Sequence, residues 1–231
     1  VCANALDNAD GQLARLTNQG TRFGRMLDGL ADHLVFLSVY VHLCLRYISA
    51  GGTSWVCLLA LAAGISHSLQ SAAADYFRNG YLHFVLGKPR VELDSAETIG
   101  RAYRGMSWRV RPLRKLLQGL YLNYTLAQER LSPAIRELHL AASAEFRDGV
   151  PPSFSEDYRA SAKPLTKWLS VLTTNTRMLC LFALLLLGHP VWFFVLELTV
   201  FNALLFYVVA RHEQIASVLR PSAERPAHVL A

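Results

Sequence analysis

Four aspartates near the start of the chain are spaced so that their carboxylates could converge. Asp7 and Asp10 are three residues apart, and Asp28 and Asp32 are four residues apart. Helical residues at these spacings share one face, and we expect a tight turn at Asn18–Thr21 to bring the two pairs together. Clustered carboxylates repel one another unless cations neutralise them, and all-oxygen ligands favour Mg²⁺, Mn²⁺ or Ca²⁺ over zinc. The spacing therefore predicts a divalent-metal site.

Two glycines and an arginine accompany these acids. Gly11 would let a ligand lie close to the helix backbone, and Arg15, one turn later, could pair with anionic groups of that ligand. Gly24 would allow close approach of the second helix. Either glycine could instead serve only as a small packing residue between membrane helices. An acidic helix end exposed to water would need neither this spacing nor a glycine, so we favour the functional interpretation.

The full pattern from Asp7 to Asp32 is D-x2-D-G-x2-A-R-x8-G-x3-D-x3-D. It resembles the signature of the CDP-alcohol phosphotransferase (CDP-alcohol phosphatidyltransferase) family at every specified position. The resemblance implies an enzyme of phospholipid or related lipid synthesis. It would transfer a phosphoalcohol or phosphatidyl group from a CDP-linked donor to an alcohol acceptor and release CMP.

The resemblance also implies residue roles. Asp7, Asp10 and Asp28 would hold one Mg²⁺ or Mn²⁺ ion, and Asp7, Asp28 and Asp32 would hold or approach a second. Asp32 would also act as the catalytic base that takes the proton from the acceptor hydroxyl. The positions that would contact the CDP group are Asp7, Gly11, Arg15 and Thr21.

Two substrate arrangements share this motif, and both remain open. In one, the lipid carries the CDP, as CDP-diacylglycerol, and the acceptor is a small polyol or its phosphate. In the other, the headgroup carries the CDP, and the acceptor is a lipid alcohol such as diacylglycerol or a ceramide. The chain has a long insertion, residues 87–163, that the compact family members using CDP-diacylglycerol lack. The motif alone therefore does not distinguish the two substrate arrangements.

Polar residues elsewhere are candidates for binding the acceptor. A stripe at helical spacing runs along the second apolar stretch, and it consists of His67, Ser71, Asp75 and Arg78. It could form a headgroup pocket, or it could be a hydrogen-bonded seam between helices.

Arg177 lies within the third apolar stretch, where an arginine is costly unless it pairs or meets water. It could bind the phosphate of the acceptor, or it could pair with Glu197 or Asp75 for structure. We favour the ligand role slightly.

The elements that must position these residues are membrane helices. The chain of 231 residues is 52% hydrophobic and 17% charged, whereas soluble domains carry about 25% charged residues. Four apolar stretches are long enough to cross a bilayer, which needs about 20 residues, and they are Met26–Ile48, Ser54–Phe77, Leu165–Leu187 and Pro190–Ala210. Very short loops join the first pair and the last pair, so each pair is predicted to be a hairpin.

We therefore expect an all-α polytopic membrane bundle. At least one further span should precede Val1, which would give about six in the intact protein. Residues 1–86 would form the membrane helices that carry the motif, residues 87–163 a cytoplasmic amphipathic helical insertion, mostly at the membrane surface, and residues 164–231 a C-terminal hairpin and tail. Helical periodicity is clearest in the middle of the insertion, at Ser95–Ala144.

The distribution of charge sets the orientation. Lys and Arg are concentrated in the insertion, around Arg15–Arg25 and in the tail, whereas the opposite side keeps almost none. The positive-inside rule then places the active site in the cytoplasm, and we expect a bacterial inner membrane. The net charge of +6 is explained by topology and anionic lipid better than by nucleic acid. We also expect a homodimer.

Two rival functions belong to other classes. A non-catalytic membrane scaffold could keep the motif for metal-dependent folding. A transporter could also carry intramembrane acids, although no inverted repeat is visible.

Overall fold

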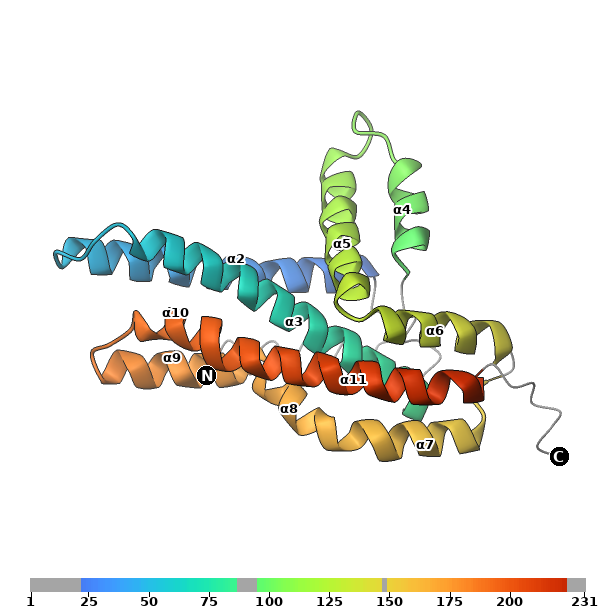
Figure 1. Cartoon of the computed structure of the whole chain (residues 1–231). Helices are drawn as coiled ribbons and strands as arrows, with labels where there is room; N and C mark the ends of the chain where they lie inside the picture. Colours follow the sequence, from blue (N-terminus) through green and yellow to red (C-terminus); the bar gives the residue numbers. More distant parts are fainter. Residues whose placement is uncertain (1–21, 87–94, 147–148, 224–231) are drawn as a thin grey trace. The chain divides into compact units, whose positions relative to one another are not determined.

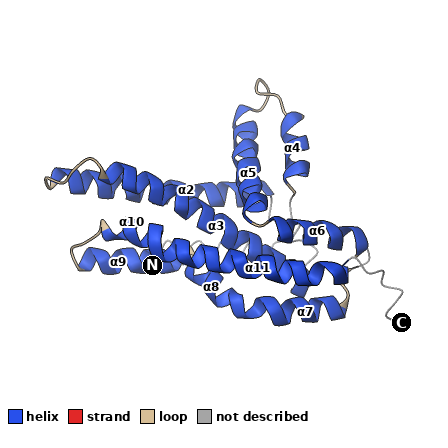
Figure 2. Cartoon of the chain, in the orientation of Figure 1, coloured by secondary structure: helices blue, strands red, loops and turns tan. Residues whose placement is uncertain are grey.

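The computed structural model describes residues 22–86, 95–146 and 149–223, and the regular structure of these residues is helical (Figure 2). The chain divides into two compact units, residues 1–39 and residues 40–231. The described part of the first unit is the beginning of α2 (Arg22–Ser49), and the remaining elements belong to the second unit. The prediction of an all-α polytopic membrane protein is confirmed, because four helical stretches among the described residues are long and apolar enough to cross a membrane.

The first predicted hairpin consists of the end of α2 and of α3 (Val56–Leu86). Their candidate spans are Leu30–Ser49 and Val56–Val85, so the second extends beyond the predicted Phe77. The connection turns at Gly51, whose φ of 87° is a left-handed conformation that residues with a Cβ rarely adopt.

The second hairpin is built from shorter helices. The chain runs through α7 (Pro152–Ala162), the short 3₁₀ segment η1 (Lys163–Leu165), α8 (Thr166–Val171) and α9 (Thr174–Leu186). It turns at Gly188, with φ of 76°, and returns through α10 (Trp192–Leu196), the π-helical turn η2 (Glu197–Phe201) and α11 (Asn202–Ala223). Large apolar side chains on these helices are exposed, as expected of surfaces that face lipid, among them Leu179, Phe182, Leu186 and Phe206.

The described residues of the predicted insertion form three separate helices before α7. These are α4 (Ala96–Arg104), α5 (Pro112–Leu131) and α6 (Pro133–Glu145). The last two each begin with a proline, which suits the first helical position because its missing N–H has no intrahelical acceptor there. In Figure 1, α4 and α5 form a hairpin that stands across the direction of α3 and α11.

The main core draws on helices from both sides of the predicted domain boundaries. It packs Phe77 and Phe84 of α3 against Leu138 of α6, Tyr158 of α7 and Val208 of α11. Thus α6 and α7, expected at the membrane surface as part of an amphipathic insertion, are structural members of the bundle. For α4 and α5, the location at the membrane surface stays a prediction.

Candidate functional site

The predicted metal and nucleotide site falls mostly on residues that the structure does not describe. Asp28 and Asp32 both lie on α2, which is unbroken from Arg22 to Ser49, so the expected one-turn spacing on a helix holds. Asp32 is exposed. The other predicted ligands and CDP contacts, Asp7, Asp10, Gly11, Arg15 and Thr21, lie outside the described residues, and the site as a whole stays a prediction.

The polar stripe on α3 does not form one pocket. His67 is buried and Ser71 is half-buried, whereas Asp75 and Arg78 are exposed. The carboxylate of Asp75 accepts a hydrogen bond of 2.7 Å from the Tyr124 hydroxyl on α5. Burial, and then the Asp75 charge, raises the pKa of Tyr124, so this hydroxyl remains protonated and acts as the donor.

Arg177 is fully buried within α9, and protein groups surround its guanidinium. Its Nε donates to the Glu197 carboxylate at 3.0 Å, and its Nη1 donates to the Leu172 carbonyl at 2.7 Å and to the Ser71 hydroxyl at 3.2 Å. Its Nη2 donates to the side-chain carbonyl of Gln70. The guanidinium also lies 5.4 Å from the centre of the Phe201 ring.

Glu197 is equally buried and joins this arginine to two further side chains. Its Oε1 lies 3.4 Å from Nδ1 of His67, and the same nitrogen lies 3.3 Å from the Tyr40 hydroxyl. Its Oε2 has no hydrogen-bond partner among the described residues. The two buried charges compensate each other, which is the condition under which ionised side chains persist within a membrane span.

Gln70 connects this ion pair to the π-helical turn. Its side-chain amide donates to the backbone carbonyl of Glu197 at 3.0 Å and to the side-chain oxygen of Asn202 at 2.9 Å. The Asn202 amide in turn donates to the Leu198 carbonyl and to the Ser66 hydroxyl. A π-turn disturbs the regular helical hydrogen bonds, and in a membrane its carbonyls need partners within the protein, which these two amides provide.

The geometry therefore matches the structural alternative for Arg177 and His67, a hydrogen-bonded seam between helices. The sequence correctly pointed to Glu197 as a partner of Arg177, but Asp75, the other candidate partner, instead accepts a bond from Tyr124. Gln70 and Asn202 were missed. Gln70 lies one turn after His67, so its position on the same helical face was the available signal.

A second pair of buried polar groups lies outside the predicted site. Nε2 of His139 and the hydroxyl of Tyr158 have no hydrogen-bond partner among the described residues. Both face Gly80, where an added Cβ would lie 3.2 Å from the His139 nitrogen and 3.4 Å from the Tyr158 oxygen. Burial, with a smaller contribution from His83, lowers the pKa of His139 to about 3, so the imidazole is neutral at physiological pH.

The N-terminal part of the chain is similar to known proteins. The family model of CDP-alcohol phosphatidyltransferase matches residues 1–87. The chain is 52% identical to the rat CDP-diacylglycerol–inositol 3-phosphatidyltransferase over 47 residues, which are 20% of this chain and 22% of the rat protein. It is 51% identical to the human protein of the same name over 50 residues, which are 22% of this chain and 24% of the human one.

The aligned region thus spans about a fifth of the length of these curated relatives. No solved structure matches the chain. The matched region contains the complete aspartate pattern from Asp7 to Asp32, so the resemblance drawn from the motif is confirmed. Over residues 1–87, the chain is similar to proteins of the CDP-alcohol phosphatidyltransferase family.

Proposed function

We propose that the protein transfers a phosphatidyl group from CDP-diacylglycerol to the hydroxyl of a small polyol and releases CMP. The observation that carries the proposal is the family match over residues 1–87, which includes all four aspartates. The names of the rat and human relatives favour CDP-diacylglycerol as the donor and an inositol-like polyol as the acceptor. The reverse arrangement, a CDP-headgroup with a lipid alcohol, is the alternative.

The residues fit divalent metal ions. Carboxylate oxygens are the ligands that Mg²⁺ and Mn²⁺ prefer, and Asp28 and Asp32 occupy successive turns of one helix. Asp7, Asp10, Asp28 and Asp32 would hold two ions, which supply positive charge to the donor pyrophosphate and to the leaving CMP.

The proposed residue roles follow the order of the reaction. Gly11, Arg15 and Thr21, with Asp7, would hold the CDP group. Asp32 would then accept the proton of the acceptor hydroxyl, whose oxygen attacks the β-phosphorus. A new phosphoester bond forms, the phosphoanhydride bond breaks, and CMP leaves with that electron pair.

The decisive experiment measures CMP released by purified full-length protein with Mn²⁺ and a panel of CDP donors. CDP-diacylglycerol with inositol should give CMP, and both chelation of the metal and Asp32→Asn should abolish it. Asp157→Asn, at an exposed acid on α7, is the matched control and should leave the rate unchanged. Release from a CDP-headgroup instead would support the alternative substrates. No donor-dependent CMP above the Asp32→Asn background would reject the enzyme in favour of a scaffold or a transporter.

Three further expectations complete the proposal. The basic tip of the α4–α5 hairpin supports a cytoplasmic active site by the positive-inside rule, and protease accessibility in sealed vesicles tests it. The homodimer remains a prediction, which light scattering in detergent would test. The bacterial inner membrane also remains a prediction, and the three curated relatives are mammalian proteins.

A further inference from the structure

The α4–α5 hairpin has a strongly basic sequence. Between Thr98 and Gln128 the chain contains no aspartate or glutamate, and its cations are Arg101, Arg104, Arg109, Arg111, Arg114 and Lys115. Arg101 lies 4.0 Å from Glu97 at the base of the hairpin. Arg109, Arg111 and Arg114, at and beside the tip, are exposed. The tip therefore carries positive charge that its own sequence does not neutralise.

Large apolar side chains accompany these cations. The tip exposes 51% of Trp108 and 75% of Val110, and α5 exposes Leu113, Leu116 and Leu120. The three leucines follow an i, i+3, i+7 spacing and so form one stripe along α5. Scattered exposed leucines are ordinary, but a continuous apolar stripe next to clustered cations indicates a surface that contacts a partner.

The hairpin is well organised, so this exposure belongs to its folded form. At its base, Ser95 caps α4 by accepting from the Thr98 amide, and Glu129 accepts from the Ala96 amide at 2.8 Å. Near the tip, the Lys115 ammonium donates to the Met106 carbonyl at 2.7 Å. The same ammonium lies over the rings of Tyr103 and Trp108.

Two contacts fix the level of the hairpin along the membrane helices. Tyr124 of α5 bonds Asp75 of α3, and α3 rises about 28 Å between Val56 and Asp75 at 1.5 Å per residue. Ser132, at the end of α5, bonds Glu213 of α11, which lies about 31 Å along the helix from Trp192. Both paths equal the hydrocarbon thickness of about 30 Å. With one interface at Val56 and Trp192, the base of the hairpin therefore lies at the opposite interface.

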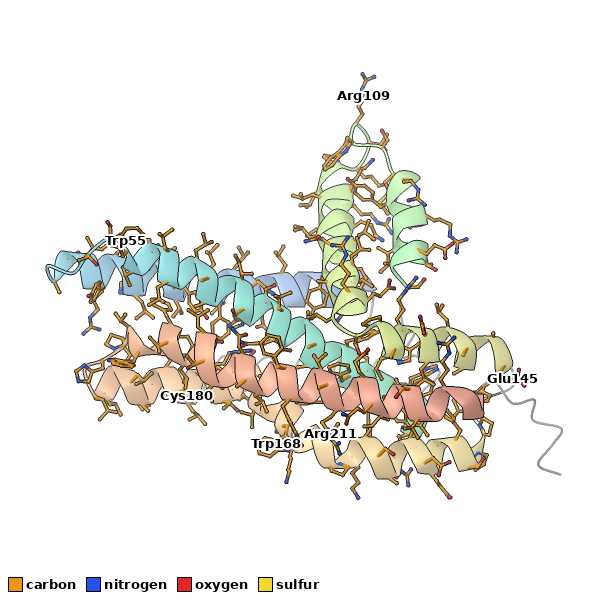
Figure 3. All side chains as sticks on the ribbon, viewed as in Figure 1. Trp55, Arg109, Glu145, Trp168, Cys180 and Arg211 are labelled. Carbon is orange, nitrogen blue, oxygen red and sulfur yellow. The ribbon has the colours of Figure 1, made fainter. Side chains whose placement is uncertain are left out.

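Exposed tryptophans mark the interface at Val56 and Trp192. Trp55 is 73% exposed and Trp192 is 61% exposed, and each lies at the start of a membrane helix, where aromatic side chains favour the headgroup level. Since α5 stands across α3 and α11 (Figure 1), it runs roughly parallel to the membrane plane at the opposite interface. Figure 3 shows Arg109 at the end of the hairpin farthest from α3.

We propose that the α4–α5 hairpin is a docking surface for anionic phospholipids of the membrane that the other helices cross. Trp108 and the leucine stripe insert at the boundary between headgroups and acyl chains, and Arg109, Arg111 and Arg114 bind lipid phosphates. Amphipathic helices with apolar and cationic side chains bind membranes in this way, and each cation near an anionic surface strengthens binding about fivefold. An RNA or an acidic protein would also attract the cations, but neither accounts for the interfacial level.

The test follows the environment of Trp108 in full-length protein whose other tryptophans, Trp55, Trp168 and Trp192, are replaced by phenylalanine. The protein is placed in nanodiscs of phosphatidylcholine alone or of phosphatidylcholine with phosphatidylserine, each with or without brominated lipid. Bromine should quench Trp108 strongly in the anionic nanodiscs at low salt. Quenching should weaken at high salt and in the neutral nanodiscs, because the attraction is electrostatic.

Variants separate the charge and the apolar contribution. Arg109→Gln, Arg111→Gln and Arg114→Gln together should lower the ratio of docked to free hairpin roughly 100-fold in anionic nanodiscs. Lys163→Gln, Lys167→Gln and Arg211→Gln remove the same charge from exposed positions elsewhere and should change Trp108 quenching little. Leu116→Glu, within the stripe, should also release the hairpin.

Some results would overturn the proposal. Equal quenching in neutral and anionic lipid would reject the anionic preference. If Trp108 stayed accessible to aqueous acrylamide in every nanodisc, the hairpin would not contact lipid, and protection gained only on adding RNA or an acidic protein would identify another partner. Quenching of Trp108 in the protein that keeps all three arginines tests the lipid contact even if a variant folds poorly. This measurement does not depend on CMP release.

Discussion

The buried pair of Arg177 and Glu197 allows a quantitative test of whether this arginine is structural or binds substrate. Replacing Arg177 by leucine removes the cation and four hydrogen bonds, to Glu197, Leu172, Ser71 and Gln70. Glu197 then remains fully buried, with His67 at 3.4 Å as a neighbouring polar group. The substitution therefore leaves a buried charge without its counter-ion.

The expected cost follows from that stranded charge. Two unit charges 4 Å apart attract by about 4 kcal/mol at an effective dielectric constant of 20, and removing one partner of a buried pair typically costs about 3–5 kcal/mol. We therefore expect Arg177→Leu to lower the free energy of unfolding by about 4 kcal/mol. Replacing both Arg177 and Glu197 by leucine should recover about half of this loss, because no charge is left buried.

The assay is reversible unfolding in mixed micelles, followed by circular dichroism, with CMP release and the acceptor KM measured on the same samples. Arg211→Leu, at an exposed arginine of α11, is the matched control and should cost little. The reasoning is refuted if Arg177→Leu unfolds within about 1 kcal/mol of the unsubstituted protein while the acceptor KM rises about tenfold. That result would make Arg177 a ligand for the acceptor.

Three further predictions concern the contacts around α6. Since the pKa of His139 is about 3 in the folded protein and about 6.5 in the unfolded one, only the unfolded state gains a proton between these values. Stability should therefore fall by about 2 kcal/mol from pH 7.5 to pH 5, and the difference from His139→Leu isolates this loss. Gly80→Ala should cost about 1 kcal/mol by thermal unfolding, because the crowding of the added methyl group against the His139 nitrogen at 3.2 Å outweighs the gain in helix propensity; a raised midpoint would contradict this. Glu213→Gln should cost about 1–2 kcal/mol, because the carboxylate accepts the Ala134 amide at the start of α6, and hydrogen exchange at that amide should rise.

The membrane helices could be predicted because the signals that define them are local. An apolar stretch long enough to span a bilayer has few other stable conformations. Gly51 and Gly188 mark the two turns between spans, because these turns require a positive φ. The ends of the helices were less predictable. The candidate span through α9 begins at Pro152 and not at the predicted Leu165. The reason is that η1 and α8 connect α7 to α9 with only a short break in the helix.

The division of the insertion could not be predicted from its composition. Amphipathic periodicity shows that α5 and α6 each have an apolar face, but it does not show what covers that face. Leu138 of α6 packs in the core, whereas Leu116 of α5 is exposed. The Glu213 carboxylate of α11 bonds Ser132 at the start of α6 and so holds α6 in the core. The two residues are far apart in sequence, so this contact could not be predicted.

The aspartate motif and the Arg177 seam differ in how far sequence reasoning could reach. The motif is recognised because, in the proposed enzyme, each residue would contact a ligand of fixed shape, and this restricts residue types and spacings. The seam is defined by contacts among side chains far apart in sequence. Gln70 accepts from Arg177, donates to the Glu197 carbonyl and donates to Asn202. The Gln70 amide thereby links the ion pair to the π-turn. Its acceptor is the backbone carbonyl of Glu197, and the side chain of Glu197 binds Arg177. An arginine within an apolar stretch predicts that such partners exist, but only the packing of α3 against η2 identifies them.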